Sequence, residues 1–134
     1  MSGMVVDTSA AVALLSGEPT GSALIDAFDT NGSRLMSAAS LVELGIVLEA
    51  RFGPVGFGIV ERFLREAEVE IVPVDHEQAG VAVAAWRRFG KGRHVAALNL
   101  GDCFTYALAE VSGLPILCTG DGFTHTDLSV VGSG

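Results

Sequence analysis

Short apolar segments that alternate with helical patterns are the feature that most restricts how this chain can fold. Strands are predicted at residues 4–6, 34–37, 70–73 and 115–118, with a weaker one at 128–131. Apolar residues at helical spacing predict helices at residues 10–15, 19–28, 38–52, 56–67, 76–89 and 100–112. Strands buried on both faces read as apolar runs, and strand–helix alternation gives parallel pairing. We therefore expect a doubly wound α/β fold with a short parallel sheet.

Length and composition exclude several classes of protein. A chain of 134 residues, 49% of them hydrophobic, has the size of one domain and is not disordered, so we expect a single domain over residues 1–134. No apolar run approaches the roughly 20 residues of a membrane span, and the first residues lack the basic flank of a signal peptide. We therefore expect a cytoplasmic protein that does not contact the membrane.

The two cysteines do not predict a disulfide framework or a zinc site. Cys103 and Cys118 stand in apolar surroundings, and the three histidines have no zinc-ligand spacing relative to them. We expect both cysteines to behave as small buried hydrophobic residues.

The charge of the chain is unusual for a protein that binds nucleic acid. The formal net charge is −8, whereas phosphate-binding surfaces are usually basic. Half of the eight Lys and Arg residues nevertheless fall in one short segment with a histidine: Arg87, Arg88, Lys91, Arg93 and His94. This basic loop is a candidate phosphate contact, although a solvated flexible loop explains it equally well.

Four acidic residues follow the predicted strands or begin the predicted helices. Asp7 comes directly after the first strand, and Asp121 follows the strand at 115–118. Glu43 lies in the first turns of the helix at 38–52, and Asp102 lies in the first turn of the helix at 100–112. Because ligands bind beyond the carboxyl ends of parallel strands, we expect all four carboxylates at one edge of the sheet.

Such a cluster suits a hard divalent cation. Mg²⁺ and Mn²⁺ take oxygen ligands, typically one or two carboxylates with water and substrate phosphate. Without metal the carboxylates repel one another, so we expect some of them to hold protons above their ordinary pKa. The positive end of the helix near Leu100 should help to keep Asp102 ionised. Each acid also has a purely structural explanation: Asp7 and Asp102 as helix-start residues, Glu43 on a solvent-facing side of its helix, Asp121 in a turn.

Several motifs resemble those of PIN domains. Val5-Val6-Asp7-Thr8-Ser9-Ala10 resembles their first strand and first acidic motif, and Ser40-Leu41-Val42-Glu43 resembles their S-x-x-E motif. Asn99-Leu100-Gly101-Asp102 is similar to their N-x-G-D motif, and the segment 117–123 to the one carrying the last acidic position. The segments 89–94, 97–99 and 125–128 resemble VapC toxins of bacterial toxin–antitoxin pairs.

The resemblance covers almost the whole chain in the correct order, and it implies a three-layer α/β/α PIN-like domain with divalent-metal endoribonuclease activity. It implies Mg²⁺ or Mn²⁺ as the cofactor and RNA, either tRNA or ribosomal RNA, as the substrate. It also implies two protein partners, a cognate VapB-type antitoxin and a second copy of the chain. By position, Asp7 and Asp102 become metal ligands, and Glu43 a third ligand or a contact to metal-bound water. The implied hydrogen-bond partners are Ser9, Ser40, Asn99 and Thr119, and the basic loop becomes the RNA-phosphate contact.

The segment around Asp121 departs from the family pattern at the next residue, Gly122. Many relatives have two acidic residues before the phenylalanine, where this chain has Asp121-Gly122. If the second is the functional one, three carboxylates remain, with Asp127 as a replacement. Two alternatives are a binding-only PIN module that acts through its partner and a phosphorelay receiver. The receiver needs a lysine late in the chain, and the only lysine, Lys91, is in the wrong place.

Overall fold

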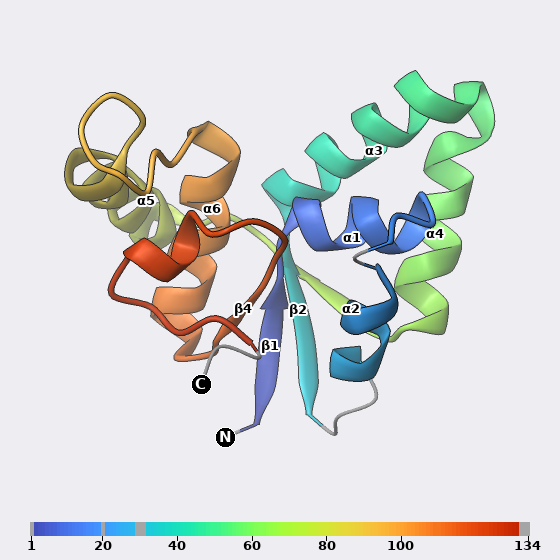
Figure 1. Cartoon of the computed structure of the whole chain (residues 1–134), viewed down its shortest axis with the longest axis horizontal. Helices are drawn as coiled ribbons and strands as arrows, with labels where there is room; N and C mark the ends of the chain where they lie inside the picture. Colours follow the sequence, from blue (N-terminus) through green and yellow to red (C-terminus); the bar gives the residue numbers. More distant parts are fainter. Residues whose placement is uncertain (1, 20, 29–31, 132–134) are drawn as a thin grey trace.

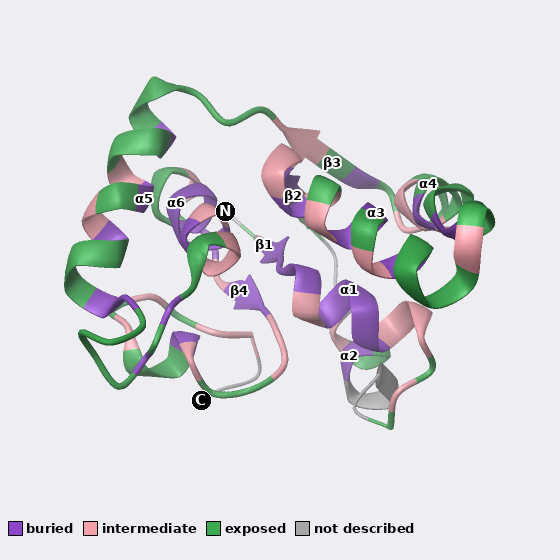
Figure 2. Cartoon of the chain, turned by 90° about the horizontal axis from the view of Figure 1, so that it is seen from above, coloured by how far each residue is buried: buried purple, intermediate pink, exposed green. Residues whose placement is uncertain are grey.

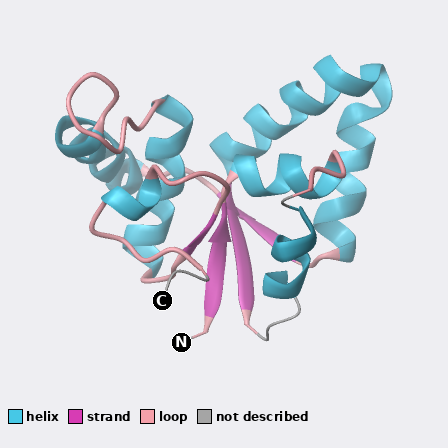
Figure 3. Cartoon of the chain, in the orientation of Figure 1, coloured by secondary structure: helices cyan, strands magenta, loops and turns pink. Residues whose placement is uncertain are grey.

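Four parallel strands form the centre of the fold, in the order β3-β2-β1-β4 (Figure 3). The computed structural model describes residues 2–19, 21–28 and 32–131. The strands are β1 (Gly3–Val6), β2 (Ser33–Ser37), β3 (Val69–Val72) and β4 (Ile116–Leu117). From β1 the chain adds β2 and β3 on one side and then returns to add β4 on the other. The order therefore reverses at β1, and ligands bind at such switch points, beyond the carboxyl ends of the strands.

Helices connect these strands and cover both faces of the sheet. They are α1 (Thr8–Leu15), α2 (Gly21–Phe28), α3 (Ala38–Phe52), α4 (Gly56–Glu66), α5 (His76–Phe89) and α6 (Leu100–Ser112), with 3₁₀ turns η1 (Gly53–Val55) and η2 (Phe123–His125). Figure 1 shows α5 and α6 on one side of the strands and α1 to α4 on the other. The predicted α/β/α arrangement is confirmed.

Alternation along β1 divides the core into two layers. Val5 packs with buried residues of α5 and α6, whereas Met4 and Val6 pack with residues of α1 to α4. In β4, Ile116 and Leu117 are divided between the same two layers. Side chains of successive strand residues point to opposite faces, so a single short strand contributes to both cores. Figure 2 shows that the buried residues are concentrated on β1, β4, α1 and α6.

Polar caps start the helices that follow the strands. Asp7 caps α1, Ser37 caps α3 and Asp75 caps α5, each with a side-chain oxygen that accepts a hydrogen bond from the first turn. Asn99 caps α6 in the same way, and Gly113 ends that helix in the left-handed conformation at φ 70°. The helices after β1 and β2 thus begin at the carboxyl edge of the sheet, where the candidate site lies.

The boundaries differ from the predicted ones by more than one residue at three places. Helix α1 begins at Thr8 rather than residue 10, because Asp7 already caps it, and α2 begins at Gly21 rather than residue 19. The predicted strand at 128–131 is wrong: within the described residues it forms only one bridge, Ile116 with Val130. Since β4 has two residues, it offers too short an edge for a longer ladder. No helix in the described part of the chain is long and apolar enough to cross a membrane.

Candidate active site

Asp7 lies at the centre of the candidate site, and both of its carboxylate oxygens are held. The residue is only 4% exposed. Oδ2 accepts hydrogen bonds from the backbone nitrogen of Ser9 at 3.1 Å and from its hydroxyl at 2.6 Å. Oδ1 accepts one from the hydroxyl of Thr105 at 2.6 Å. A buried carboxylate is tolerated only when it is hydrogen-bonded, and these bonds also fix its orientation.

Asp102 is held by a reciprocal pair of hydrogen bonds with Asn99. The backbone nitrogen of Asp102 donates to Oδ1 of Asn99 at 2.9 Å, and the backbone nitrogen of Asn99 donates to Oδ2 of Asp102 at 3.0 Å. This capping box fixes the side chain of Asp102 at the first turn of α6. Its Oδ1 has no hydrogen-bond partner in the part of the chain that the structure describes.

Glu43 reaches the start of α6 from α3, across the edge of the sheet. A methyl group on Gly101 would stand 2.8 Å from Oε1 and 2.9 Å from Oε2 of Glu43. The carboxylate therefore lies directly over the backbone of Gly101, the residue before Asp102. Only glycine permits this close approach without displacing Glu43.

The charges of Asp7 and Glu43 both influence Asp102. Burial raises the pKa of Asp102, the hydrogen bond from Asn99 lowers it, and the charges of Asp7 and Glu43 raise it further. The net direction is upward, as carboxylate repulsion predicts. The backbone nitrogen of Asn99, at the start of α6, favours the ionised form of Asp102, as expected, but burial has the larger effect on the pKa.

Asp121 and Asp127 do not join these three carboxylates. The side chain of Asp121 is 91% exposed, and its Oδ2 lies 3.7 Å from Nε2 of His125. Gly120, just before it, has a left-handed φ of 76°, and Asp121 is not among the charges that raise the pKa of Asp102. The expectation that all four acids converge is therefore wrong for this side chain, while a catalytic role for Asp121 stays a prediction.

Asp127 has structural partners instead. Its Oδ1 accepts a hydrogen bond from the hydroxyl of Tyr106 at 2.6 Å, and its Oδ2 lies 3.3 Å from the guanidinium of Arg88. Burial alone would raise the pKa of Asp127. The hydrogen bond from Tyr106 and the charge of Arg88 nevertheless hold this pKa below its ordinary value. Asp127 thus ties the C-terminal segment to α5 and α6 and does not replace Asp121 in the cluster.

The predicted hydrogen-bond partners occupy different places around the acids. Ser9 contacts Asp7 and Asn99 contacts Asp102, while the backbone nitrogen of Thr119 donates to the Ser9 hydroxyl at 3.1 Å. Ser40 does not reach an acid: its hydroxyl lies 3.4 Å from that of Thr105. Sequence reasoning missed Thr105, although its position one helical turn after Asp102 places both side chains on one face of α6.

The two cysteines lie near the acids. Cys103 is buried as predicted, whereas Cys118 is only partly buried. Burial, with the charges of Asp7 and Asp102, raises the pKa of Cys118 to about 12. Burial and Asp102 also raise the pKa of Cys103. Both thiols therefore stay protonated and neutral at pH 7.

The basic loop is exposed, but its residues are not equally available. Arg88 pairs with Asp127, and the guanidinium of Arg93 lies 4.1 Å above the ring of Trp86. Nδ1 of His94 accepts a hydrogen bond from the backbone of Ala96 at 3.0 Å. Within the described residues, Arg87 and Lys91 make no ion pair.

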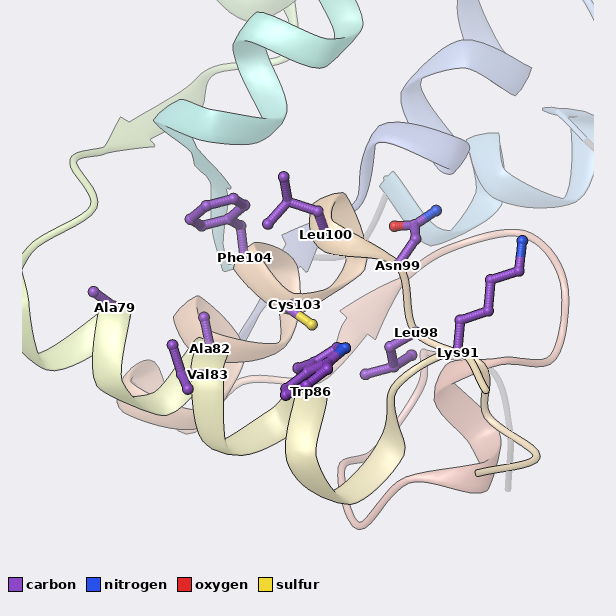
Figure 4. A pocket seen from close by; sticks show the side chains of 10 residues that line it. All are labelled: Ala79, Ala82, Val83, Trp86, Lys91, Leu98, Asn99, Leu100, Cys103 and Phe104. Atoms are coloured by element: carbon purple, nitrogen blue, oxygen red, sulfur yellow. The ribbon is translucent and has the colours of Figure 1, made fainter. Parts of the chain in front are cut away.

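Two apolar hollows flank the start of α6. The α5–α6 pocket, of about 510 Å³, is lined by Trp86, Leu100 and Phe104 among others, with Lys91 and Asn99 at one end (Figure 4). The α3–α6 groove, of about 420 Å³, is lined by Val42, Ile46, Leu100 and Phe104, with Glu43 beside them. Asn99 and Leu100 line both, so the start of α6 separates the two hollows.

The three acids offer the oxygen ligands that a divalent cation prefers, but they do not surround an ion on all sides. Among the residues that the structure describes, no three His, Cys, Asp or Glu side chains are gathered tightly enough to hold a metal ion. Mg²⁺, however, usually keeps several waters and uses one or two protein carboxylates. Oδ1 of Asp7 accepts a single hydrogen bond, and Oδ1 of Asp102 accepts none from described residues. The carboxylates of Asp7, Asp102 and Glu43 therefore fit such an ion.

Comparison with known proteins identifies the family of this chain. The model of the PIN domain family matches residues 4–127. The chain belongs to the PIN domain family. It is 49% identical to "Ribonuclease VapC30" of Mycobacterium tuberculosis over 128 residues, which is 96% of this chain and 98% of the relative. It is 50% identical to "Ribonuclease VapC" of Mycolicibacterium smegmatis over 128 residues, 96% of this chain and 99% of the relative.

Solved PIN-domain structures share the fold at lower identity. The chain resembles VapC20 of Mycobacterium tuberculosis, described as a sarcin–ricin loop cleaving toxin, with a TM-score of 0.78 at 18% identity, covering 96% of this chain and 98% of that one. It also resembles a toxin–antitoxin complex from Klebsiella pneumoniae, with a TM-score of 0.71 at 16% identity and 96% of each chain covered. At these identities the likeness establishes the fold alone.

Proposed function

We propose that this chain is a Mg²⁺- or Mn²⁺-dependent endoribonuclease and the toxin of a type II toxin–antitoxin pair. The observation that carries the proposal is the meeting of Asp7, Glu43 and Asp102 at the switch point of the sheet. Close relatives named VapC ribonucleases support it over nearly the full chain. An RNA substrate, tRNA or ribosomal RNA, would place the protein in the cytoplasm.

The residues divide the work of phosphodiester hydrolysis. Asp7 and Asp102 would bind the ion, and Glu43 would bind either the ion or a water that it carries. When bound, such an ion supplies positive charge for a phosphodiester oxygen and makes a water molecule more acidic near neutral pH. Ser9 and Thr105 orient Asp7, and Asn99 orients Asp102. Burial raises the pKa of Asp102 and favours its protonated form, whereas binding the ion requires the ionised carboxylate, so ion binding would displace any proton on Asp102.

The test is cleavage of purified tRNA and ribosomal RNA in millimolar Mg²⁺, with EDTA as the control. We expect cleavage that EDTA abolishes and that Mn²⁺ restores. Sequencing of the new 5′ ends would identify the RNA and the site. Cleavage that persists in EDTA would contradict the proposed mechanism.

Gly101→Ala should separate activity from stability. The new methyl group would displace the Glu43 carboxylate, so we expect the cleavage rate to fall by about 10- to 100-fold, as loss of a supporting contact at a metal site does. Alanine favours a helix over glycine by roughly 0.5–1 kcal/mol, so the melting temperature should not fall. Gly58→Ala on α4 is the matched control, since its methyl group would meet nothing within 4 Å. Equal rates for both variants would exclude a role for Glu43.

Arg87 and Lys91 are proposed to contact RNA phosphates. Replacing both with Ala should weaken RNA binding across sequences and reduce the slope of log K against log salt by about 1.4, or about 0.7 for each contact to a single strand. Arg62→Ala on α4 is the control, because Arg62 pairs with Glu66 on the surface of that helix. Salt titrations of binding to a fluorescent RNA give the slopes, and an unchanged slope would contradict the contact.

A cognate VapB-type antitoxin is the proposed protein partner. Structural neighbours include toxin–antitoxin complexes. The acidic cluster offers a site for an Arg side chain, whose planar fork pairs well with carboxylates. We expect co-expression with a cognate VapB-type antitoxin to yield a complex that does not cleave RNA. A complex that cleaves as fast as the free chain would contradict inhibition.

We also propose that the chain forms a homodimer through the α3–α6 groove. Val42, Ile46 and Leu100 beside it are 61%, 66% and 75% exposed. Contiguous exposed apolar side chains mark protein interfaces, whereas isolated ones do not. Light scattering after gel filtration should give a dimer, and Ile46→Glu a monomer. A monomeric wild-type chain would overturn this proposal.

A binding-only PIN module is the alternative function. The exposed position of Asp121 and the glycine after it favour this alternative, because a fourth acid is then missing from the cluster. Such a module would bind its antitoxin but would gain no stability from Mg²⁺ and would cleave no RNA.

A further inference from the structure

Two fully buried hydroxyl groups lie among the elements that carry the acids. Thr105 is 0% exposed and Ser40 is 1% exposed. Thr105 lies one turn after Asp102 on α6, and Ser40 lies one turn before Glu43 on α3. Residues at this spacing share a helix face, so each of these helices presents an acid and a buried hydroxyl on the same side.

The hydrogen bonds between these groups have a single possible direction. An ionised carboxylate only accepts, so Thr105 donates its one hydroxyl hydrogen to Oδ1 of Asp7 at 2.6 Å. The Ser40 and Thr105 hydroxyls lie 3.4 Å apart, and with the hydrogen of Thr105 already used, Ser40 must be the donor. Ser40 itself is held to the start of α1, where the Thr8 hydroxyl donates to the Ser40 carbonyl at 3.4 Å.

This direction restricts what Asp7 can still bind. A carboxylate offers about four lone-pair positions. The two donors of Ser9 occupy Oδ2, and Thr105 occupies one position on Oδ1. One position on Oδ1 remains, and the hydroxyl of Thr105 determines where it points.

We propose that Thr105 is a positioning residue for metal binding, supported by Ser40. Its hydroxyl holds Asp7 in the orientation that leaves one lone pair of Oδ1 open to the divalent ion, so this inference rests on the proposed function. The competing explanation is that Thr105 only satisfies a buried carboxylate. That role would affect folding and leave the metal affinity of the folded protein unchanged.

Metal affinity measured without RNA separates the two explanations. Mn²⁺ binding to the metal-free protein is measured by calorimetry for the wild type, Thr105→Val and Thr105→Ser. Valine keeps the shape of threonine but has no hydroxyl, and serine keeps the hydroxyl. We expect Thr105→Val to bind Mn²⁺ about 10- to 100-fold more weakly, the usual effect of losing a partner behind a metal ligand. Thr105→Ser should bind close to the wild type.

Cleavage kinetics and a control in the same helix complete the test. For Thr105→Val the metal concentration at half-maximal rate should rise, with most of kcat recovered at saturating metal. Ser112→Ala removes a hydroxyl that donates to a carbonyl at the far end of α6 and should change neither quantity. If Thr105→Val does not fold, Ser40→Ala removes the donor behind Thr105 and should weaken Mn²⁺ binding in the same direction.

The outcomes distinguish this inference from the proposed function. A wild type that binds Mn²⁺ and cleaves RNA, with Thr105→Val or Ser40→Ala binding Mn²⁺ equally well, overturns the role of Thr105 alone. A wild type that neither binds Mn²⁺ nor cleaves overturns both.

Discussion

Replacing Asp102 with Asn is expected to remove RNA cleavage and, at the same time, to make the metal-free protein more stable at pH 7. Asn has no charge for a divalent ion, so the rate should fall by more than the roughly 100-fold that loss of a supporting partner produces. The amide oxygen can still accept the hydrogen bond from Asn99, so the start of α6 should persist. Asp7→Asn should show a similar loss of cleavage.

The gain in stability follows from the raised pKa of Asp102. The folded protein binds a proton at Asp102 more tightly than the unfolded chain does. The stability that this provides is fully present below the ordinary pKa of 3.8 and is lost as the pH rises through the folded-state value. At pH 7 the ionised carboxylate is therefore unfavourable without metal, and Asn removes that penalty. The advantage of Asp102→Asn should vanish as the pH falls below 3.8.

Thermal melts in EDTA between pH 7 and a pH below 3.8 measure the stability of both proteins, and cleavage assays measure their activity. Asp26→Asn, on the exposed surface of α2, changes the net charge equally and should alter neither stability nor cleavage. Undiminished cleavage by Asp102→Asn would mean that the three acids are not the active site. Lower stability in EDTA at pH 7 would mean that the capping box stabilises the fold by more than burial and the neighbouring charges destabilise it.

Mg²⁺ should stabilise the wild-type protein strongly, because it relieves the repulsion among the same carboxylates. An ion present at 100 times its Kd adds about 2.7 kcal/mol to the free energy of unfolding. For a chain of 134 residues this corresponds to a rise in Tm of roughly 10 °C. Asp7→Asn should lose most of that rise. An equal ionic strength of NaCl controls for screening, and identical melts in Mg²⁺ and NaCl would favour the binding-only alternative.

Much of the site was predictable because strand ends and helix starts follow from local sequence. The apolar run before Asp7 and the helical spacing after Asn99 place two acids at one edge of a parallel sheet without any knowledge of contacts. Helices α3 and α6 have the predicted bounds, and therefore Glu43 and Asp102 stand on the predicted turns.

The remaining features depend on side-chain direction and on distant partners, which local patterns do not determine. The side chain of Asp121 is 91% exposed and faces His125, which its place after a strand does not predict. The sequence suggests that Arg88 and Arg93 are both available to bind phosphate. In the structure Arg88 pairs with Asp127, and the guanidinium of Arg93 stacks over the ring of Trp86. Thr105 cannot be predicted from the sequence, because a threonine within a helix has no distinctive local pattern and its partner, Asp7, lies 98 residues away.

The division of the core into two layers has a consequence for how this site tolerates mutation. Glu43 comes from a helix on one face of the sheet and Asp102 from a helix on the other, and they meet over Asp7 at the edge between them. A substitution that loosens either layer would shift one acid relative to the rest before the fold is lost. Inactive but folded variants should therefore be found in both hydrophobic layers, far from any residue that touches RNA.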